Sequence, residues 1–574
     1  MRLQHFLYST LFTLGVATAL TGCYDYTDLA EEAVSNEAPI VLDLTIGADV
    51  HASRAVSDRT TRALPMGGED GDGRELGADF ENAVTDISLY YYKDPSGILS
   101  ADATPVKRMI YIDNVDAVDG AKTTTTGDKI VKHIPLKRSM LDGYEHQFGD
   151  QFIIVANMGN VAAPTTLGAL RNMLVEHAWT GAADAAKSTY SKFVMSNERN
   201  SVYYEKEGTK ENPHLITADI ERVAARLDFC SNGCDEDGYL GGTGNPASPV
   251  DGGLPSIRYT ARDGGEVGKV YVTHVRPFNV MQKPTYLIKR SALTSSETPV
   301  YLKNEYAYND AEFAYVVDPL TWSKKSKPAN NELSDLTTWY GTTHYSYVNA
   351  AYATNENYRV HVNKASDADG FNAEKGYSHV NKAEDTSNGF TDFYVLDYAN
   401  ENTMVADATT HEVATGYVVR AVYVPKTAFA SADAAIAGTP TLTLSPGSTY
   451  YRYRPLVKSF SEGLCRYFDT EAAAHDYAAK HVDTPYLVEK FEKGVCYYIT
   501  YLRHDNGNDV TPFDPEITPM EYGIVRNNIY RLKCSFTGPG YNEIPPTPTF
   551  EPLGIKPYIF VRRWYQIEHP EINI

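Results

Sequence analysis

The stretch IVLDLTIGADVHASR, residues Ile40–Arg54, begins with an apolar residue at every second position and ends in a polar tract. Ile40, Leu42, Leu44 and Ile46 share one face of a β-strand, because successive side chains of a strand point to opposite faces. At about 1.5–3 kcal/mol per buried aliphatic side chain, these four contribute about 6–12 kcal/mol when buried. That is comparable to the whole stability of a typical domain, about 5–15 kcal/mol. The stretch therefore predicts a strand whose burial matters to the stability of its whole domain.

The tract that follows this strand carries three arginines among small and polar residues. Arg54 and Arg62 each precede an alanine, and Arg59 lies between them. Such a composition favours a mobile chain that a protease reaches. A cut here would release the strand and leave an apolar groove with unpaired backbone groups on its walls. We interpret Ile40–Ile46 as a temporary plug strand and the three arginines as protease cleavage sites; a permanent first strand followed by a solvated loop is the alternative.

The N-terminal segment has the organisation of an export signal. A charged start at Arg2 precedes an apolar run from Phe6 to Leu20 and small residues before Cys23. The last four residues, Leu20-Thr21-Gly22-Cys23, resemble a bacterial lipobox, which predicts lipidation of Cys23 and a stable membrane tether. An ordinary signal peptide with a chance cysteine is the alternative. No later segment has the eighteen or so apolar residues that a membrane span requires.

Composition limits the class of protein. A chain of 574 residues is long enough for two to four domains. Its net charge of −22 excludes nucleic acid as a partner, because phosphate binding needs clustered Lys and Arg. Tyrosine is abundant, with 43 residues against 4 Trp, which suits pleated, half-buried surfaces. We therefore expect a mainly β protein.

Period-two alternation recurs in short segments separated by turn formers, as in β-sandwiches. Helical spacing is limited to TLGALRNMLVEHAW from Thr166 and TEAAAHDYAAKHV from Thr470. The predicted strands are ISLYYY from Ile87, QFIIVANMGN from Gln151, VYVTHVRPFNV from Val270, YVVRAVYVP from Tyr417 and GVCYYITYL from Gly494.

Catalytic and metal-binding patterns are weak throughout. No nucleophile elbow, zincin, P-loop or dinucleotide motif occurs in a fitting context, so we expect no enzyme and no cofactor. Asp235, Glu236 and Asp237 lack the spacing of a calcium loop, and a solvated acidic loop is favoured; we expect no metal. Cys230 and Cys234 are interpreted either as a local disulfide or as buried thiols. The remaining cysteines, Cys465, Cys496 and Cys534, receive no chemical role.

Several segments together resemble the fimbrillin proteins of Bacteroidales, most closely the shaft subunit of the short (minor) fimbria. The most specific is the run VRNNIY from Val525 to Tyr530. The others are ITADIERVAARLDF from Ile216, TDFYVLDYANENT from Thr391, GYVVRAVYVPK from Gly416, KGVCYYITYLRH from Lys493, and the proline-rich C-terminal segment with its final Trp-containing strand.

This resemblance implies two transthyretin-like or Ig-like β-sandwich domains, a few short helices and a C-terminal donor strand. Tyr541 to Pro557 would be a stiff spacer that leaves the sheet, since it contains Pro545, Pro546 and Pro548. Beyond it, Ile559, Val561, Tyr565 and Ile567 share one face, interrupted only by Arg563, that would enter a neighbour's sheet; an ordinary final strand of the chain's own domain is the alternative. The predicted organisation is a signal peptide (1–22), a propeptide with the plug strand (23–54), an N-terminal sandwich (55–215), a C-terminal sandwich (216–540) and the spacer with the donor strand (541–574).

The resemblance also implies a function. We expect a structural subunit of a cell-surface fimbria that supports adhesion and biofilm formation, first held at the outer membrane by lipid and then polymerised head to tail by strand exchange. Its partners would be other copies of itself, fimbrial anchor and tip subunits, and an arginine-specific protease. The alternative is a fimbrial anchor, a tip adhesin or another surface ligand-binding lipoprotein.

Overall fold

The protein is mainly β with a few short helices, as predicted from the sequence. It is described from a computed structural model. The described residues are 40–46, 79–93, 102–126, 129–136, 150–180, 192–197, 214–230, 245–250, 254–292, 300–301, 315–316, 318–320, 339–343, 345, 371–372, 377–380, 393–402, 414–480, 484–502, 504, 522–546 and 553–563.

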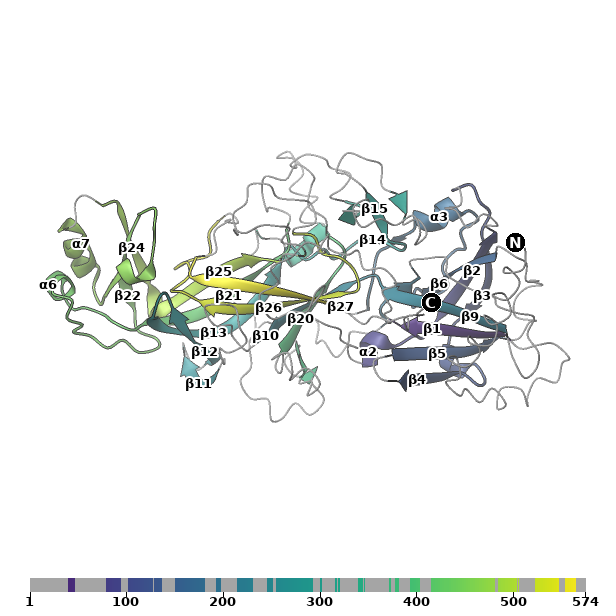
Figure 1. Ribbon diagram of the computed structural model, residues 1–574, viewed down its shortest axis with the longest axis horizontal. Coiled ribbons are helices and arrows are strands. Elements are labelled where there is room, and N and C mark those ends of the chain that lie inside the picture. The colour runs from purple at the N-terminus through teal and green to yellow at the C-terminus, as the bar shows by residue number, and fades with distance from the viewer. Residues whose placement is uncertain are drawn as a thin grey trace, which may run out of the picture.

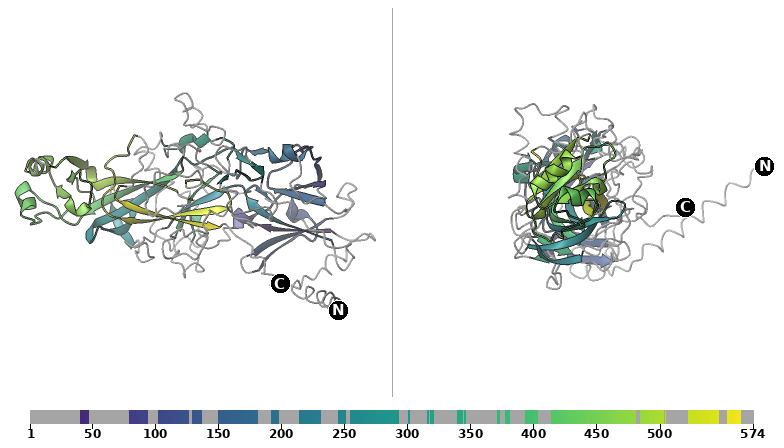
Figure 2. Two further views of the ribbon diagram at one scale, coloured as in Figure 1. Left: turned by 45° about the horizontal axis from the view of Figure 1, so that its top comes forward. Right: turned by 90° about the vertical axis from the view of Figure 1, so that its left-hand side faces the viewer.

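The molecule is elongated, with three parts following one another along its long axis (Figures 1 and 2). An N-terminal sheet domain lies at one end and a C-terminal sandwich lies in the middle. A small module forms the other end; it contains β22 (Tyr450–Pro455), β24 (Tyr486–Phe491), α6 (Ala432–Ile436) and α7 (Glu471–Ala479). The two ends of the molecule therefore differ in structure.

The N-terminal domain is built on one eight-stranded sheet that curls around a single core. Apolar residues from strands at both ends of the sheet share this core, among them Leu89, Ile134 and Ile216. In spatial order the strands are β3 (Lys107–Ile112), β2 (Ile87–Lys93), β6 (Asp150–Ala156), β8 (Met195–Ser196), β9 (His214–Arg222), β1 (Ile40–Ile46), β5 (Lys129–Leu136) and β4 (Lys122–Thr126).

The C-terminal domain is a sandwich of two sheets that share one core. Leu227 and Leu532 of one sheet and Val272 and Tyr498 of the other belong to the same buried cluster. The first sheet has the order β18 (Phe371–Asn372), β19 (Tyr377–Val380), β20 (Phe393–Ala399), β10 (Ala225–Cys230), β26 (Asn528–Phe536) and β27 (Ile555–Arg563). The second has the order β11 (Asn245–Val250), β12 (Leu254–Arg262), β13 (Glu266–Phe278), β21 (Gly416–Pro425) and β25 (Val495–Tyr501).

The chain passes from one domain to the other between β9 and β10. Strand β9 ends at Arg222 in the N-terminal sheet, and β10 begins at Ala225 in the C-terminal sandwich. The boundary predicted between residues 215 and 216 falls inside β9. The alternation of this segment indicates a strand but not the point at which the strand changes sheets, which depends on pairing with distant strands.

Smaller elements cover the junction and the faces of the sheets. Thr166 caps α3 (Leu167–Arg171), and this helix is shorter than predicted because Leu174–Val175 forms β7 and pairs with β14 (Thr285–Tyr286). Strand β15 (Arg290–Ala292) pairs with β16 (Val300–Tyr301) and β17 (Tyr315–Val316). The remaining short helices here are α2 (Asp79–Asn82), η1 (Val115–Ala117) and η6 (Gly341–Thr343).

The third part, residues 426–494, is inserted between β21 and β25, and we call it the distal module. Its sheet has the order β23 (Arg466–Phe468), β22 (Tyr450–Pro455), β24 (Tyr486–Phe491). The predicted helix from Thr470 is confirmed as α7 (Glu471–Ala479), with the Thr470 side chain accepting from the Ala473 amide. The module is completed by α6 (Ala432–Ile436), η10 (Glu462–Leu464) and η11 (Glu492–Gly494). Nothing in the sequence analysis separated this module from the C-terminal sandwich.

Across the described residues, no helix has both the length and the apolar character needed to cross a membrane.

Candidate functional site

The most unusual feature of the N-terminal sheet is the position of β1. This strand pairs antiparallel with β5 on one side and parallel with β9 on the other, so it is an internal strand of the sheet. It is also the first described segment of the chain and is separated in sequence from both of its neighbours. A sheet whose interior is completed by an N-terminal segment depends on that segment for its hydrogen bonds on two edges.

The register of β1 aligns its apolar positions with the domain core. Leu42 is the register partner of Ile134 and Ile216, which are both fully buried. Ile46 is the partner of Ile220, which is also fully buried. The residues of β5 and β9 that flank Leu42 and Ile46 therefore lie on the core side of the sheet. This is the face predicted for Ile40, Leu42, Leu44 and Ile46.

The loss of β1 would leave a slot between β5 and β9. Two strand edges would then present unpaired N–H and C=O groups, and buried residues such as Ile134 and Ile216 would lose the strand that separates them. Unpaired edges beside apolar surface bind any available strand. We call this position the strand slot.

The C-terminal strand β27 has the opposite character, because it is an edge strand. It pairs antiparallel with β26 over its whole length, from Asn528↔Arg563 to Phe536↔Ile555, and β26 is its only strand neighbour among the described residues. Ile559 and Val561 are the register partners of Leu532 and Tyr530. One of its two hydrogen-bonding edges is thus left without a strand of the described chain.

Residues Tyr558–Arg563 do not project away from their domain, contrary to what the proline-rich spacer suggests. In the uncleaved chain they are paired within their own sheet, and Ile555, at the start of the strand, is buried. Their donation to a neighbour stays a prediction. The spacer is also tied down at both ends, because Tyr541 exchanges two backbone hydrogen bonds with Tyr497 of β25, at 2.7 and 2.8 Å. A side chain at Gly540 would lie 2.2 Å from the Tyr497 carbonyl oxygen, so this close approach requires glycine. The prolines of the spacer cannot donate hydrogen bonds within a sheet. The residues on either side of them, Tyr541 and β27, are nevertheless paired with the C-terminal sandwich.

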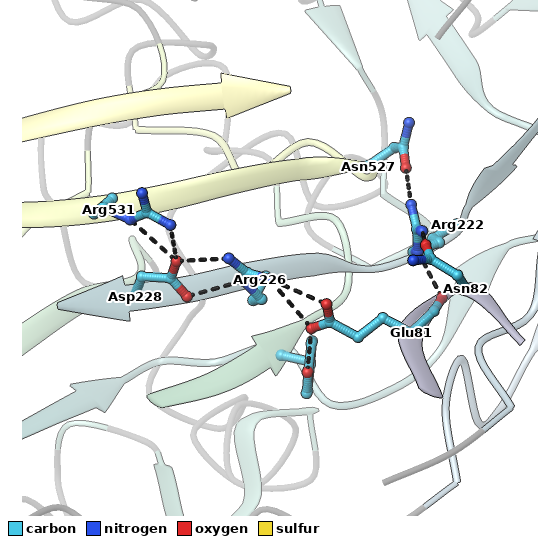
Figure 3. Close-up of polar contacts among 8 residues, drawn as sticks. Glu81, Asn82, Arg222, Arg226, Asp228, Asn527 and Arg531 are labelled. Atoms are coloured by element: carbon cyan, nitrogen blue, oxygen red, sulfur yellow. Dashed lines mark hydrogen bonds and ion pairs between the residues drawn. The ribbon is translucent and has the colours of Figure 1, made fainter. Parts of the chain in front are cut away.

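A buried polar cluster joins the two domains beside the crossing from β9 to β10 (Figure 3). Arg226 forms a bidentate pair with Asp228, with both N–O distances at 3.0 Å, and reaches Glu81 of α2 at 3.1 Å. Arg531 of β26 binds the same Asp228 at 2.8 Å. The Tyr398 hydroxyl donates to Glu81 at 2.5 Å. At most 1% of each charged side chain in these pairs is exposed.

Arg222 extends this cluster along the domain boundary. Its Nε donates to the Glu81 carbonyl oxygen at 2.8 Å, and its other nitrogens contact Asn82 and Asn527. Burial lowers the pKa of Arg222 to about 10; the nearby Glu81 opposes this shift and Arg226 adds to it. Three arginines and two carboxylates therefore hold α2, β9, β10 and β26 in one fixed arrangement.

Two further buried ion pairs and shared apolar contacts complete the junction. Arg526 contacts Glu401 at 2.6 Å, and Lys289 contacts Glu221 of β9 at 3.3 Å. Tyr398 of β20 belongs to the N-terminal core and packs edge-on against Phe193 at a centroid distance of 4.7 Å. The N-terminal and C-terminal domains are thus joined by a packed interface.

Several predicted site residues lie outside the described residues. These are the lipidation site Cys23, the cleavage sites Arg54, Arg59 and Arg62, the last two donor positions Tyr565 and Ile567, the acidic residues Asp235, Glu236 and Asp237, and Cys234. Cys230 ends β10. Cys465, Cys496 and Cys534 are buried free thiols. Among the described residues, no three His, Cys, Asp or Glu side chains gather as a metal site.

The charged junction was missed in the sequence. Its one sequence signal is charge inside an apolar strand, as in IERVAARLDF, where Arg222, Arg226 and Asp228 interrupt buried aliphatic residues. Their partners Glu81 and Arg531 are far away in the chain, so the pairing could not be inferred from spacing.

Comparison with known proteins connects the C-terminal region to fimbriae. Residues 489–569 match the sequence family described as major fimbrial subunit protein type IV, fimbrillin, C-terminal. The match includes β25, β26 and β27, that is, the edge strand and the two strands that hold it and its spacer. No curated protein sequence matches the chain.

Three solved structures are similar over most of their lengths. A fimbrilin (fimA) from Porphyromonas gingivalis W83 is 15% identical, with a TM-score of 0.36 over 93% of this chain and 100% of that one. The tip fimbrial protein Mfa3 from Porphyromonas gingivalis is 10% identical, with a TM-score of 0.32 over 92% and 100%. A putative cell adhesion protein from Bacteroides eggerthii is 10% identical, with a TM-score of 0.32 over 92% and 97%.

Proposed function

We propose that this protein is the repeating subunit of a bacterial cell-surface fimbria and supports adhesion and biofilm formation. The observation that carries the proposal is the position of β1, an internal strand supplied by the segment ahead of the arginine tract. The match of residues 489–569 to the fimbrillin C-terminal family supports it from the other end of the chain.

The pathway begins with export and lipidation at Cys23, which holds the precursor at the outer membrane. An arginine-specific protease then cuts after Arg54, Arg59 or Arg62, and the plug strand leaves with the lipid. The opened strand slot is filled by the C-terminal strand of another copy, which detaches from β26. Repetition of this exchange builds a head-to-tail polymer, which binds anchor and tip subunits at its ends.

Hydrogen bonding favours the exchange. At home, β27 is bonded along one edge, to β26. In the strand slot of a neighbour it would be bonded along two edges, to β5 and β9, as β1 is in the precursor. Each backbone hydrogen bond contributes about 0.5–1.5 kcal/mol net. Hydrogen bonds along two edges in the strand slot therefore stabilise the strand more than those along the single edge that it leaves.

The test uses the purified precursor and an arginine-specific protease. We expect cleavage to produce heat-resistant ladders on gels, with subunits that begin at Ala55 or, as second choice, Ala63. Assembled fimbriae whose subunits still begin at Cys23 would contradict the proposal and indicate an anchor instead. A cleaved protein that stays monomeric would refute strand exchange.

A further inference from the structure

The distal module carries a concentrated apolar surface. Of the eight large apolar side chains that are exposed among the described residues, seven lie in this module. Six of them belong to the segment after β22 or to the start of β24 and are 38–46% exposed; we call them the distal patch: Leu456, Val457, Phe460, Leu464, Tyr486 and Leu487. Exposed apolar side chains gathered in this way mark an interaction surface.

The patch is held by a rigid framework. The Leu456 amide donates to the Pro485 carbonyl oxygen at 2.7 Å, which brings the two patch segments together. The patch extends over both faces at this end of the sheet, because consecutive strand residues point to opposite sides. On one face, Tyr486 stacks on Tyr453 at a centroid distance of 5.6 Å. On the other face, which carries Leu487, the fully buried Arg452 pairs with Glu489 at 2.7 Å and Glu462 at 3.3 Å. A preorganised surface loses little entropy on binding.

The charge of the module identifies the kind of partner. Residues 426–494 contain eight Lys and Arg and eight Asp and Glu, so the module is neutral, whereas the whole chain carries −22. The rest of the chain therefore carries all of the net negative charge, which opposes the approach of a second copy through those parts. A neutral, apolar end is the part of one copy that can approach another without this repulsion.

The position of the module identifies the face that it meets. It lies at the end of the molecule opposite the N-terminal sheet (Figure 1). The spacer that precedes β27 starts beside it, since the Asn542 side chain donates to the Lys490 carbonyl oxygen of β24 at 3.2 Å. A copy that accepted the detached C-terminal strand would have its strand slot, and hence its N-terminal domain, next to this module.

We propose that the distal patch is a docking surface for the N-terminal domain of the next copy. This inference rests on the proposed function. The patch would position the incoming acceptor before and during strand exchange, and it would bury apolar area that the exchanged strand itself does not cover.

The test compares the double variant Leu456→Asp/Leu487→Asp with the single variant Ile436→Asp. Ile436 is the seventh exposed apolar residue of the module but lies on α6, outside the patch. We expect both proteins to fold with wild-type circular dichroism. After arginine cleavage, the double variant should elongate about tenfold more slowly than wild type, because two partly exposed leucines can no longer be buried, and Ile436→Asp should elongate normally.

A photocrosslinker at position 487 provides the second measurement. In assembled wild-type polymer, we expect crosslinked peptides to come from the N-terminal domain of another copy. Equal elongation rates for the double variant and wild type would overturn the docking surface, and so would crosslinks only to other regions. In both cases the heat-resistant ladders would still support the proposed polymer. Loss of cell attachment with normal elongation would assign the patch to an outside ligand and also overturn it. Absence of wild-type ladders would refute the proposed function and, with it, this inference.

Discussion

Asp228 is a carboxylate without access to water, and two arginines compensate its charge. Arg226 and Arg531 contact it from β10 and β26, and Glu81 balances Arg226 from α2. Removing one member of such a group leaves the others charged and buried, which costs far more than an exposed ion pair contributes. The stability of the domain junction is therefore concentrated in a few residues.

The variant Asp228→Asn tests whether the stability of the domain junction depends on these few residues. We expect it to lower the free energy of unfolding by about 3–5 kcal/mol, because two buried guanidinium groups lose their shared counter-charge. The control Glu492→Gln removes one partner of the exposed Lys490–Glu492 pair and should change stability by less than about 1 kcal/mol. Denaturant unfolding of both proteins measures the difference; equal midpoints would show that the junction does not depend on this charge.

His504 gives the folded protein a defined sensitivity to acid. Burial, with the positive charge of Lys289 as a second cause, lowers the pKa of His504 from 6.5 to about 4. The Tyr530 hydroxyl accepts from the Val525 amide and is placed to donate to His504 Nδ1 at 2.7 Å, which suits the neutral ring. Below pH 6.5 the unfolded chain binds a proton at this residue that the folded protein does not bind until about pH 4.

We therefore expect the free energy of unfolding to fall as the pH decreases from about 6.5 to about 4, with His504 contributing up to about 3 kcal/mol of the loss. His504→Gln should show a smaller loss over the same interval. His475→Gln, a change at an exposed histidine of α7, serves as the matched control and should follow wild type. Denaturant unfolding at several pH values measures these slopes; identical acid slopes for His504→Gln and wild type would contradict the prediction.

At the scale of elements, β1 and β27 differ in how many neighbours hold them. The internal β1 is bonded on both edges and the edge strand β27 on one. A single-edge strand can be peeled from its sheet without breaking the core, since most of the sandwich core lies on other strands.

A peptide of residues 553–574 tests whether β27 fits the strand slot. Added in excess to cleaved protein, it should occupy the slot and stop ladder formation, because it presents the same backbone edges as the tail of a second copy. The control peptide carries Ile559→Asp and Val561→Asp, which place charge on the face that must meet the apolar wall, and it should not inhibit. Gel ladders report the result; equal inhibition by both peptides would exclude a specific fit.

Much of the secondary structure was predictable, because alternation and helical spacing are local signals. The segments from Ile87, Gln151, Tyr417 and Gly494 form strands, and the helix from Thr470 begins at its capping threonine. What the sequence could not supply was pairing. The in-chain partner of β27, the change of sheet after Arg222 and the charged junction all depend on contacts between distant residues.

At the scale of the whole molecule, the proposed assembly requires cleavage in a tract that comes after an internal strand. The triple variant Arg54→Ala/Arg59→Ala/Arg62→Ala should remain folded and monomeric, because β1 stays in its sheet and excludes a donor. Its thermal midpoint should equal that of the uncleaved wild-type precursor. Protease treatment followed by gel analysis is the measurement, with the conservative triple Lys variant as a second uncleavable control; heat-resistant ladders from either variant would contradict the mechanism.

The direction of the strand slot has a mechanical consequence. Strands β1, β5 and β9 run roughly along the long axis of the molecule (Figure 1). Backbone hydrogen bonds run across the strands, perpendicular in an antiparallel pair such as β1–β5 and slanted in a parallel pair such as β1–β9. A strand pulled along its own length therefore loads all of them at once. Tension along a chain of such subunits would therefore act on each inserted strand in shear, where many bonds must break together, and not by unzipping, where they break one at a time. A filament joined in this way would withstand the drag of flowing liquid although none of its joints is covalent.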